Sequence, residues 1–277
     1  MNDAVVFSGN SFIGFELCRV FLEEGMTVLG CDEDELDEDR LLEIGRNANF
    51  EYQKFHHIQR PEHIPSPSYL VFSFYDGYYH RKENAWKAIK PVVEKSLDWK
   101  KHHFIFLYPS IWLKKKEKHD LYVEAEELRK QAEKEKAPVT VFYLPTVFGP
   151  RQPNSFLLAE AMTNPAFQWE QACIDEDLED ALYVEDAVDV INRQKEKSNT
   201  FILVNANPSS WEAVMSRVIH DEEQINALKK RCKDQSRNAY PFETLQVENK
   251  LPIDEAVQKQ IIHIKKREIC DFPFFKF

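Results

Sequence analysis

The sequence predicts an α/β fold with a doubly wound parallel sheet and a small C-terminal α+β lobe. From residue 4 to residue 144, short apolar runs alternate with longer amphipathic stretches, which is typical of successive βαβ units. Four of these runs are continuous enough to be buried on both faces of a sheet. The 277 residues are 43% hydrophobic and 30% charged, a composition that excludes a disordered or collagen-like chain.

The six apolar runs of this region are predicted to be the strands of one parallel sheet. They cover residues 4–7, 26–31, 50–55, 69–74, 103–108 and 139–144, and they are rich in β-branched and aromatic side chains. Between them, apolar residues at helical spacing predict helices, as at 13–21 and 86–97. Helices on both faces of a six-stranded sheet therefore follow.

The pattern changes after Pro145, and the predicted division is 1–150 for a dinucleotide-binding domain and 151–277 for a smaller substrate-side lobe that partly shares the sheet. The lobe is expected to hold helices near 155–162, 185–194, 211–220 and 253–266. Strands are expected near 167–174, 181–184 and 201–205.

The net charge of the chain indicates which classes of partner it can bind. With 36 Lys and Arg against 47 Asp and Glu, the net charge is −11, which argues against nucleic acid or an anionic membrane as a partner. No apolar stretch reaches the eighteen residues that a membrane span requires, and the first apolar run is too short for a signal peptide. Five scattered cysteines without ligand spacing favour a reducing cytoplasm, and no metal site is expected.

The segment from residue 4 to residue 32 carries the clearest chemical signal. A strand leads into the turn SGNSFIG and a helix, so that backbone N–H groups and the positive helix end can bind a diphosphate. The candidate binding residues are Gly9, Asn10, Ser11, Phe12, Ile13 and Gly14. Asp32 ends the next strand, where a carboxylate reaches ribose hydroxyls and favours NAD over NADP. The alternative is a plain βαβ unit whose glycines only make a tight turn.

The chain resembles the extended short-chain dehydrogenase/reductase family, the NAD-dependent epimerases and dehydratases that often act on nucleotide sugars. The stretches SGNSFIG, FIFLYPSIW, PVTVFYLPTVFGPRQP and YVEDAVDVI carry the likeness in the family's order. The resemblance implies a Rossmann-like sheet, NAD as cofactor, and a small-molecule substrate such as a nucleotide sugar. It also implies that Ser73 flanks the cofactor, and that Pro145, Thr146 and Val147 pass the nicotinamide.

The sequence departs from the family pattern G-x-x-G-x-x-G in the turn. Four residues separate Gly9 from Gly14, so the turn reads as one residue shorter, and Ser11 stands at the middle position. The Ser11 hydroxyl or the Asn10 amide is a candidate replacement donor to phosphate. After the fourth strand, Phe74 and Tyr75 replace small residues and are expected to pack in the core or as a lid, or to stack on a bound ring.

The catalytic helix departs further. The family places a lysine four residues after its tyrosine, but here the residue four positions after Tyr122 is Glu126. At ~5 Å and an effective dielectric near 20, repulsion between a carboxylate and a phenolate is about 3 kcal/mol, which raises the tyrosine pKa by roughly two units. The family's strand hydroxyl falls near Tyr108, with Ser110 as a possible replacement; Pro109–Ser110 also suits a plain turn.

Two functions therefore remain open from the sequence. One is an NAD-dependent oxidoreductase, epimerase or dehydratase that uses Tyr122 as acid and base and Ser110 to orient substrate. The other is a binding or regulatory protein on the same fold that has lost this chemistry. Either a monomer or a homodimer is compatible, because the helix that would form the family's dimer seam is highly charged.

Overall fold

The computed structural model describes residues 1–33, 38–58, 64–80, 87, 90–93, 98–114, 119–164, 167, 175–219, 221–231 and 241–270. The chain divides into two compact units. The first unit holds Met1–Leu144 and Val188–Ile202, and the second holds Pro145–Ala187 and Leu203–Phe277. Most of the predicted strand at 167–174 and most of the predicted helix at 86–97 lie outside the described residues.

A parallel sheet forms the first unit, as the sequence predicts, but it has more than the six predicted strands, because the strand predicted at 201–205 for the smaller lobe pairs with the strand at 139–144. Its order among the described strands is β9-β6-β5-β4-β1-β2-β3, and every neighbouring pair is parallel. The strands are β1 Asp3–Phe7, β2 Thr27–Asp32, β3 Phe50–Lys54, β4 Ser68–Ser73, β5 His103–Pro109, β6 Val139–Leu144 and β9 Thr200–Asn205. Three of them, β4, β5 and β6, are buried at every residue, which explains their continuous apolar sequence.

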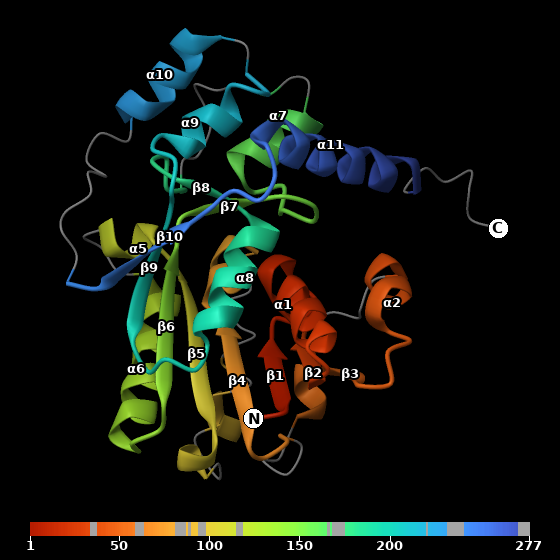
Figure 1. Ribbon diagram of the computed structural model, residues 1–277, viewed down its shortest axis with the longest axis vertical. Helices are drawn as coiled ribbons and strands as arrows, with labels where there is room; N and C mark the ends of the chain where they lie inside the picture. The colour runs from red at the N-terminus through yellow and green to blue at the C-terminus, as the bar shows by residue number, and fades with distance from the viewer. Residues whose placement is uncertain are drawn as a thin grey trace. The chain divides into compact units, whose positions relative to one another are not determined.

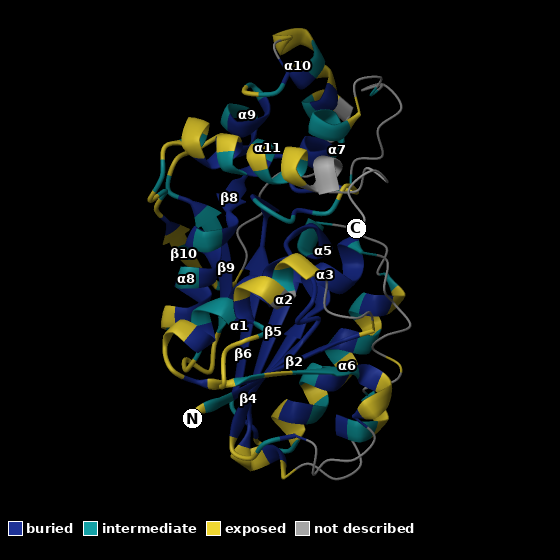
Figure 2. Cartoon of the chain, turned by 90° about the vertical axis from the view of Figure 1, so that its right-hand side faces the viewer, coloured by how far each residue is buried: buried dark blue, intermediate teal, exposed yellow. Residues whose placement is uncertain are grey.

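Helices cover both faces of this sheet. Figures 1 and 2 show α1 Phe12–Glu23 and α6 Asp120–Lys134 on opposite sides of the strands, which Figure 2 colours as buried. Helix α1 buries Phe12, Phe15, Leu17 and Phe21. The other helical elements of this region are α2 Glu38–Ile44, η1 Phe55–His57, α3 Phe74–Tyr79, η3 Trp99–Lys101 and α5 Ile111–Lys114. Helix α8 Val184–Gln194 runs from the second unit into the first.

The second unit is a smaller α+β assembly. It contains β7 Thr146–Phe148, α7 Leu157–Thr163, β8 Ala181–Tyr183, α9 Ser210–Met215, α10 Glu222–Arg231, β10 Glu243–Val247 and α11 Ile253–Cys270. Strands β7 and β8 pair in parallel, and β10 extends the sheet order beside β9, where the Ala206 amide donates to the Val247 carbonyl. Its core gathers apolar side chains from β7, β8, α7, α9, α10 and α11, with Trp211 and Phe148 among them. Strands β7 and β10 and helix α10 were not predicted.

Neither pair of adjacent histidines lies within one strand. His56 and His57 belong to η1 and their ring centroids are 4.1 Å apart, while His102 precedes β5, where its ring pairs with Ser68 Oγ at 3.0 Å and the His103 ring pairs with Thr140 Oγ1 at 2.7 Å. Among the described residues, no helix combines the length and apolar composition needed to cross a bilayer.

Candidate functional site

The turn between β1 and α1 keeps the family spacing, contrary to the shorter turn read from the sequence. Ser8 has a φ of +70°, in the left-handed region that favours glycine. Ser8, Ser11 and Gly14 are therefore the three positions of the turn, each three residues after the last. Serine replaces glycine at the first two positions.

The two glycines of the turn are required by packing within the protein. A Cβ on Gly14 would lie 2.0 Å from the Ser8 carbonyl oxygen, and a Cβ on Gly9 would lie 2.8 Å from Gly30 Cα. Gly9 also donates its amide to the Cys31 carbonyl at 2.9 Å. These contacts hold α1 tightly against β1 and β2. Packing alone therefore explains the two glycines, and they are not evidence for a bound phosphate.

Asp32 lies at the end of β2 and is fully buried. Its Oδ2 accepts hydrogen bonds from the backbone N–H of Asn10 at 3.2 Å and from Ser11 Oγ at 3.0 Å, and its Oδ1 accepts from the backbone N–H of Glu33 at 2.8 Å. Arg40 Nη1 donates to Asn10 Oδ1 at 3.0 Å. The structure therefore brings Asn10, Ser11 and Asp32 together. The Ser11 hydroxyl, expected to meet phosphate, donates to Asp32 instead, whereas the Asn10 group that donates to Asp32 is its backbone N–H and not the side-chain amide expected from the sequence.

A second carboxylate, Asp76, lies at the N-terminus of α1. Its Oδ1 accepts from the Ile13 amide at 3.1 Å, and its Oδ2 accepts from the Gly14 amide at 2.8 Å. Ser73 Oγ donates to the same Oδ2 at 2.8 Å. These amides belong to the first turn of α1, where the helix has no partners of its own, and Ser11 at the N-cap makes no side-chain cap.

Burial governs the charge of Asp76. The side chain is 1% exposed, and this burial raises its pKa from 3.8 to about 6, against the lowering effect of its three hydrogen bonds. The Asp32 carboxylate contributes in the same direction. Asp76 is therefore mostly ionised at pH 7 and above, and its negative charge is stabilised by the helix end.

NAD is the cofactor that the resemblance and the fold imply, and its diphosphate would bind at the turn between β1 and α1. A diphosphate binds a helix N-terminus through the same amides and the same positive potential that Asp76 already uses. A phosphate placed ~4 Å from the ionised carboxylate would be repelled by about 4 kcal/mol at an effective dielectric near 20. The residues of the turn do not fit a diphosphate while Asp76 is ionised and in place.

Tyr122 lies on α6, and the residue four positions later is part of an ion pair. Glu126 accepts two hydrogen bonds from Arg129, at 2.9 Å from Nε and 2.7 Å from Nη2. The Tyr122 pKa is raised, as expected, but mainly by burial; the Glu126 charge adds to the shift and Arg129 opposes it. The Glu126 carboxylate is thus held by an arginine one turn further along the helix.

The strand that faces α6 carries Tyr108 where the family has a small hydroxyl residue. Tyr108 is fully buried, and its hydroxyl donates to the Ala125 carbonyl at 3.3 Å. Burial raises the pKa of Tyr108 well above its ordinary value. Ser110 follows β5; its amide donates to the Leu144 carbonyl at 2.7 Å and its carbonyl accepts from the Leu113 amide at 2.9 Å. The backbone of Ser110 therefore forms a turn, and its catalytic role stays a prediction.

Aromatic side chains fill the region after β4. Phe74 and Tyr75 are 1% and 0% exposed, so they pack in the core, which is one of the alternatives that the sequence left open. Phe72 stacks on Phe106 with ring centroids 5.4 Å apart, and Phe74 meets Tyr108 edge-on at 5.9 Å. Ser73, expected to flank a cofactor, serves as the N-cap of α3 and as the donor to Asp76.

The remaining predicted residues, Pro145, Thr146 and Val147, belong to the second unit. Thr146 Oγ1 donates to the Asp177 carbonyl at 2.8 Å and approaches Glu176 Oε2 at 3.5 Å. Glu176 is buried, and its Oε1 accepts from the Leu157 amide at the start of α7 at 2.5 Å. Burial raises its pKa to about 8.

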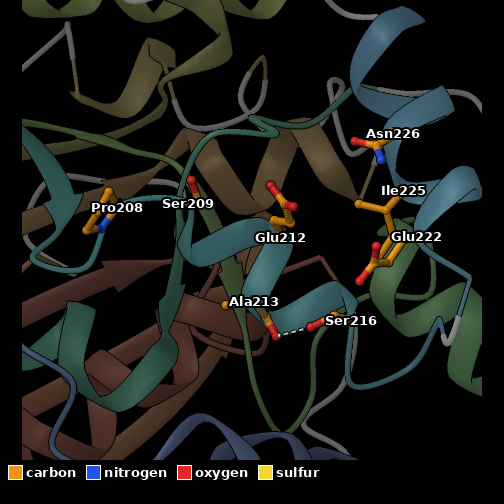
Figure 3. Close-up of a pocket in the computed structure, with 8 residues that line it drawn as sticks. All are labelled: Pro208, Ser209, Glu212, Ala213, Ser216, Glu222, Ile225 and Asn226. Atoms are coloured by element: carbon orange, nitrogen blue, oxygen red, sulfur yellow. Dashed lines mark hydrogen bonds between the residues drawn. The ribbon is translucent and has the colours of Figure 1, made fainter.

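The second unit also has a pocket of about 410 Å³ beside α9 and α10 (Figure 3). Its lining consists of Pro208, Ser209, Glu212, Ala213, Ser216, Glu222, Ile225 and Asn226. Two of these residues are glutamates and none is a cation, so the pocket is unsuited to an anionic diphosphate. No residue predicted from the sequence lines it, and the described residues contain no cluster of three or more His, Cys, Asp or Glu that could hold a metal.

Sequence reasoning missed Asp76 and Arg40. Asp76 comes three residues after Ser73, which ends β4. In a parallel sheet the carboxyl end of β4 lies beside the carboxyl end of β1, where the turn into α1 begins. This signal was available, because the carboxyl ends of β1 and β4 are at one edge of the sheet. Arg40 follows an acidic run that gave no such signal.

No sequence-family profile matches the chain, and no curated protein sequence is significantly similar to it. Solved structures are similar in fold. A dTDP-glucose 4,6-dehydratase from Bacillus anthracis, in complex with NAD, is 16% identical over 97% of this chain and 98% of its own, with a TM-score of 0.64. A UDP-glucose 4-epimerase from Thermotoga maritima, with UDP-glucose, is 16% identical over 96% and 99%, with a TM-score of 0.61.

A third similar structure is a UDP-glucuronic acid 4-epimerase from Bacillus cereus, in complex with UDP-glucuronic acid and NAD. It is 14% identical over 96% of this chain and 99% of its own, with a TM-score of 0.60. Identities this low establish the fold and nothing finer, and the fold agrees with the resemblance found in the sequence. The chain therefore has the Rossmann-like α/β fold of NAD-dependent nucleotide-sugar epimerases and dehydratases, from which it diverges widely in sequence.

Proposed function

We propose that this chain binds a nucleotide sugar or a related small molecule and does not carry out hydride transfer on it. The observation that carries the proposal is the ion pair between Glu126 and Arg129 beside Tyr122. In the family that the sequence resembles, an ammonium four residues after the tyrosine lowers the tyrosine pKa and holds the nicotinamide ribose. Here that position carries a carboxylate, and its positive partner is committed to it.

The surroundings of Tyr122 support the same conclusion. A general base works best with a pKa near the operating pH, and the Tyr122 pKa is raised from an ordinary value that is already too high. The large aromatic side chain of Tyr108 takes the place of the small hydroxyl residue that would orient substrate. The ligand class comes from the similar structures, which hold UDP-glucose or UDP-glucuronic acid.

An NAD-dependent epimerase or dehydratase is the second candidate. It is favoured by the fold, which matches structures solved with NAD over nearly their whole length. It is also favoured by Asp32 at the end of β2, the position of a ribose-binding carboxylate. This candidate requires Tyr122 to act as acid and base without a neighbouring ammonium.

The two candidates differ in turnover. Purified protein is incubated at pH 8 with NAD and UDP-glucose, UDP-glucuronic acid or dTDP-glucose, and products are separated by ion-exchange chromatography. We expect no conversion, while the melting temperature rises with at least one of the three sugars in the absence of NAD. Conversion that disappears in Tyr122→Phe but persists in Tyr69→Phe, a control at a tyrosine on β4, would establish the enzyme instead.

A charge exchange tests the role of the ion pair. The single change Glu126→Lys would place two cations side by side and is expected to destabilise α6. The double change Glu126→Lys with Arg129→Glu keeps a pair of opposite charges and puts an ammonium four residues after Tyr122. We expect the double variant to fold and to lower the Tyr122 pKa, as read by ultraviolet titration against Tyr122→Phe. An unchanged pKa would remove the basis of the proposal.

A further inference from the structure

We infer that the anion bound at the N-terminus of α1 is the chain's own Asp76 carboxylate, which excludes the diphosphate of a dinucleotide from that position at neutral pH. The inference concerns cofactor binding and does not depend on the loss of catalysis proposed above. It rests on the placement of Asp76, on the chemistry of the two amides it binds, and on the fit of the surrounding side chains.

The placement is specific. Asp76 reaches α1 from a segment more than sixty residues further along the chain, and both of its oxygens are used: one meets Ile13 and the other meets Gly14. This bidentate arrangement uses the amides that a carboxylate or phosphate takes at a helix N-terminus. The carboxylate therefore already provides the negative charge that a bound diphosphate would bring.

The side chains around Asp76 hold it in place. Ser73 binds it twice, because the Ser73 hydroxyl donates to Oδ2 and also accepts from the Asp76 amide at 3.4 Å. Asp76 lies on α3, whose six residues are all buried. Moving the carboxylate away from α1 would break these contacts or expose buried aromatic residues.

Asp32, at the end of β2, acts electrostatically on Asp76, and its effect is repulsive. From α1 the carboxylate is faced by the amides of Ile13 and Gly14, and from its own segment by the Ser73 hydroxyl. A diphosphate at this position would thus meet two carboxylates. Asp32 has its Oδ2 engaged with Asn10 and Ser11, so both acidic groups of the site are used within the protein.

Binding of NAD to charge-altered variants tests the inference. Isothermal titration at pH 8 compares the wild type with Asp76→Ala and Asp76→Asn, using NAD and ADP as probes. The control is Asp98→Asn, which removes an exposed carboxylate paired with Lys101 in the same unit. We expect no saturation below about 1 mM for the wild type and the control, and at least about tenfold tighter binding for Asp76→Ala.

Several results would overturn the inference. One is saturable binding of NAD by the wild type at pH 8 with a Kd that Asp76→Ala leaves unchanged or weakens. Another is a folded Asp76→Ala variant, with native circular dichroism, that gains no affinity for either probe. Should both variants fail to fold, the wild type is titrated at pH 5 and pH 8: tighter binding at pH 5 is expected, and equal affinity at the two pH values contradicts the inference. Turnover assays read the proposed loss of catalysis separately.

Discussion

Replacement of Asp76 by asparagine should make the free energy of unfolding less dependent on pH. Burial raises the pKa of Asp76 from 3.8 to about 6, so between these values the native state binds a proton that the unfolded chain has released. The wild type therefore loses stability as pH rises through this window. One pKa unit corresponds to 1.36 kcal/mol, so the shift amounts to about 3 kcal/mol in all.

The asparagine variant has no proton to bind at this position. Its side chain keeps one oxygen that can accept a hydrogen bond from an α1 amide, but it has no charge. The free energy of unfolding of the variant should therefore rise relative to that of the wild type, by about 3 kcal/mol between pH ~4 and pH ~7.5. Urea unfolding followed by circular dichroism, at four pH values across this range, measures that difference. Other titrating groups cancel because they are common to both proteins.

Asp98→Asn supplies the control for this series. Asp98 is exposed and pairs with Lys101 at 3.1 Å, so its replacement should change the pH dependence much less than Asp76→Asn does, through the small effect of Asp98 on the pKa of His102. A curve for Asp76→Asn parallel to that of the wild type would refute the assignment of Asp76 as a buried, charged cap. A difference that shrinks as pH rises would refute it too, because the sign of the linkage would be reversed.

Three further predictions concern residues of both units. Glu176→Gln should remove a loss of stability of up to about 5 kcal/mol that the wild type shows between pH 4.5 and 8, because burial raises the Glu176 pKa to about 8. Unfolding at pH ~4 and pH ~9 measures this loss. Arg129→Ala should cost about 2 kcal/mol, because Glu126, 13% exposed, loses its partner. Lys90→Ala should cost under about 0.5 kcal/mol in the same denaturation assay, because Lys90 reaches the more exposed Glu127 of α6 from outside that helix. Gly14→Ala should cost at least about 3 kcal/mol or prevent folding, because its Cβ would lie 2.0 Å from a backbone oxygen; a soluble variant of wild-type melting temperature contradicts this.

Strands β4, β5 and β6 were predictable because each is buried at every residue and so has a continuous apolar sequence. Strand β10 was missed because four of its five residues are not buried, which leaves no apolar run to detect. Helix α10 was missed because its sequence EEQINALKKR is mostly polar, with Ile225 and Leu228 as its buried apolar positions.

The candidate site was predictable in part. The turn, Asp32 and the replacement at Glu126 follow from local sequence against the family pattern. The left-handed Ser8 was not foreseen, since serine seldom takes that conformation. The contact of Asp76 with α1 was missed although Asp76 follows the carboxyl end of a predicted strand; the order of the strands in the sheet, which places β4 directly beside β1, decides that the two segments meet.

The central claim is that Asp76 occupies the diphosphate position at the start of α1. A crystal structure of the wild-type protein grown at pH 8 and soaked in NAD tests it most directly. The account predicts the Asp76 carboxylate within hydrogen-bond distance of the Ile13 and Gly14 amides, with no phosphate beside them. A diphosphate bound to these amides, with Asp76 displaced from α1, would contradict it.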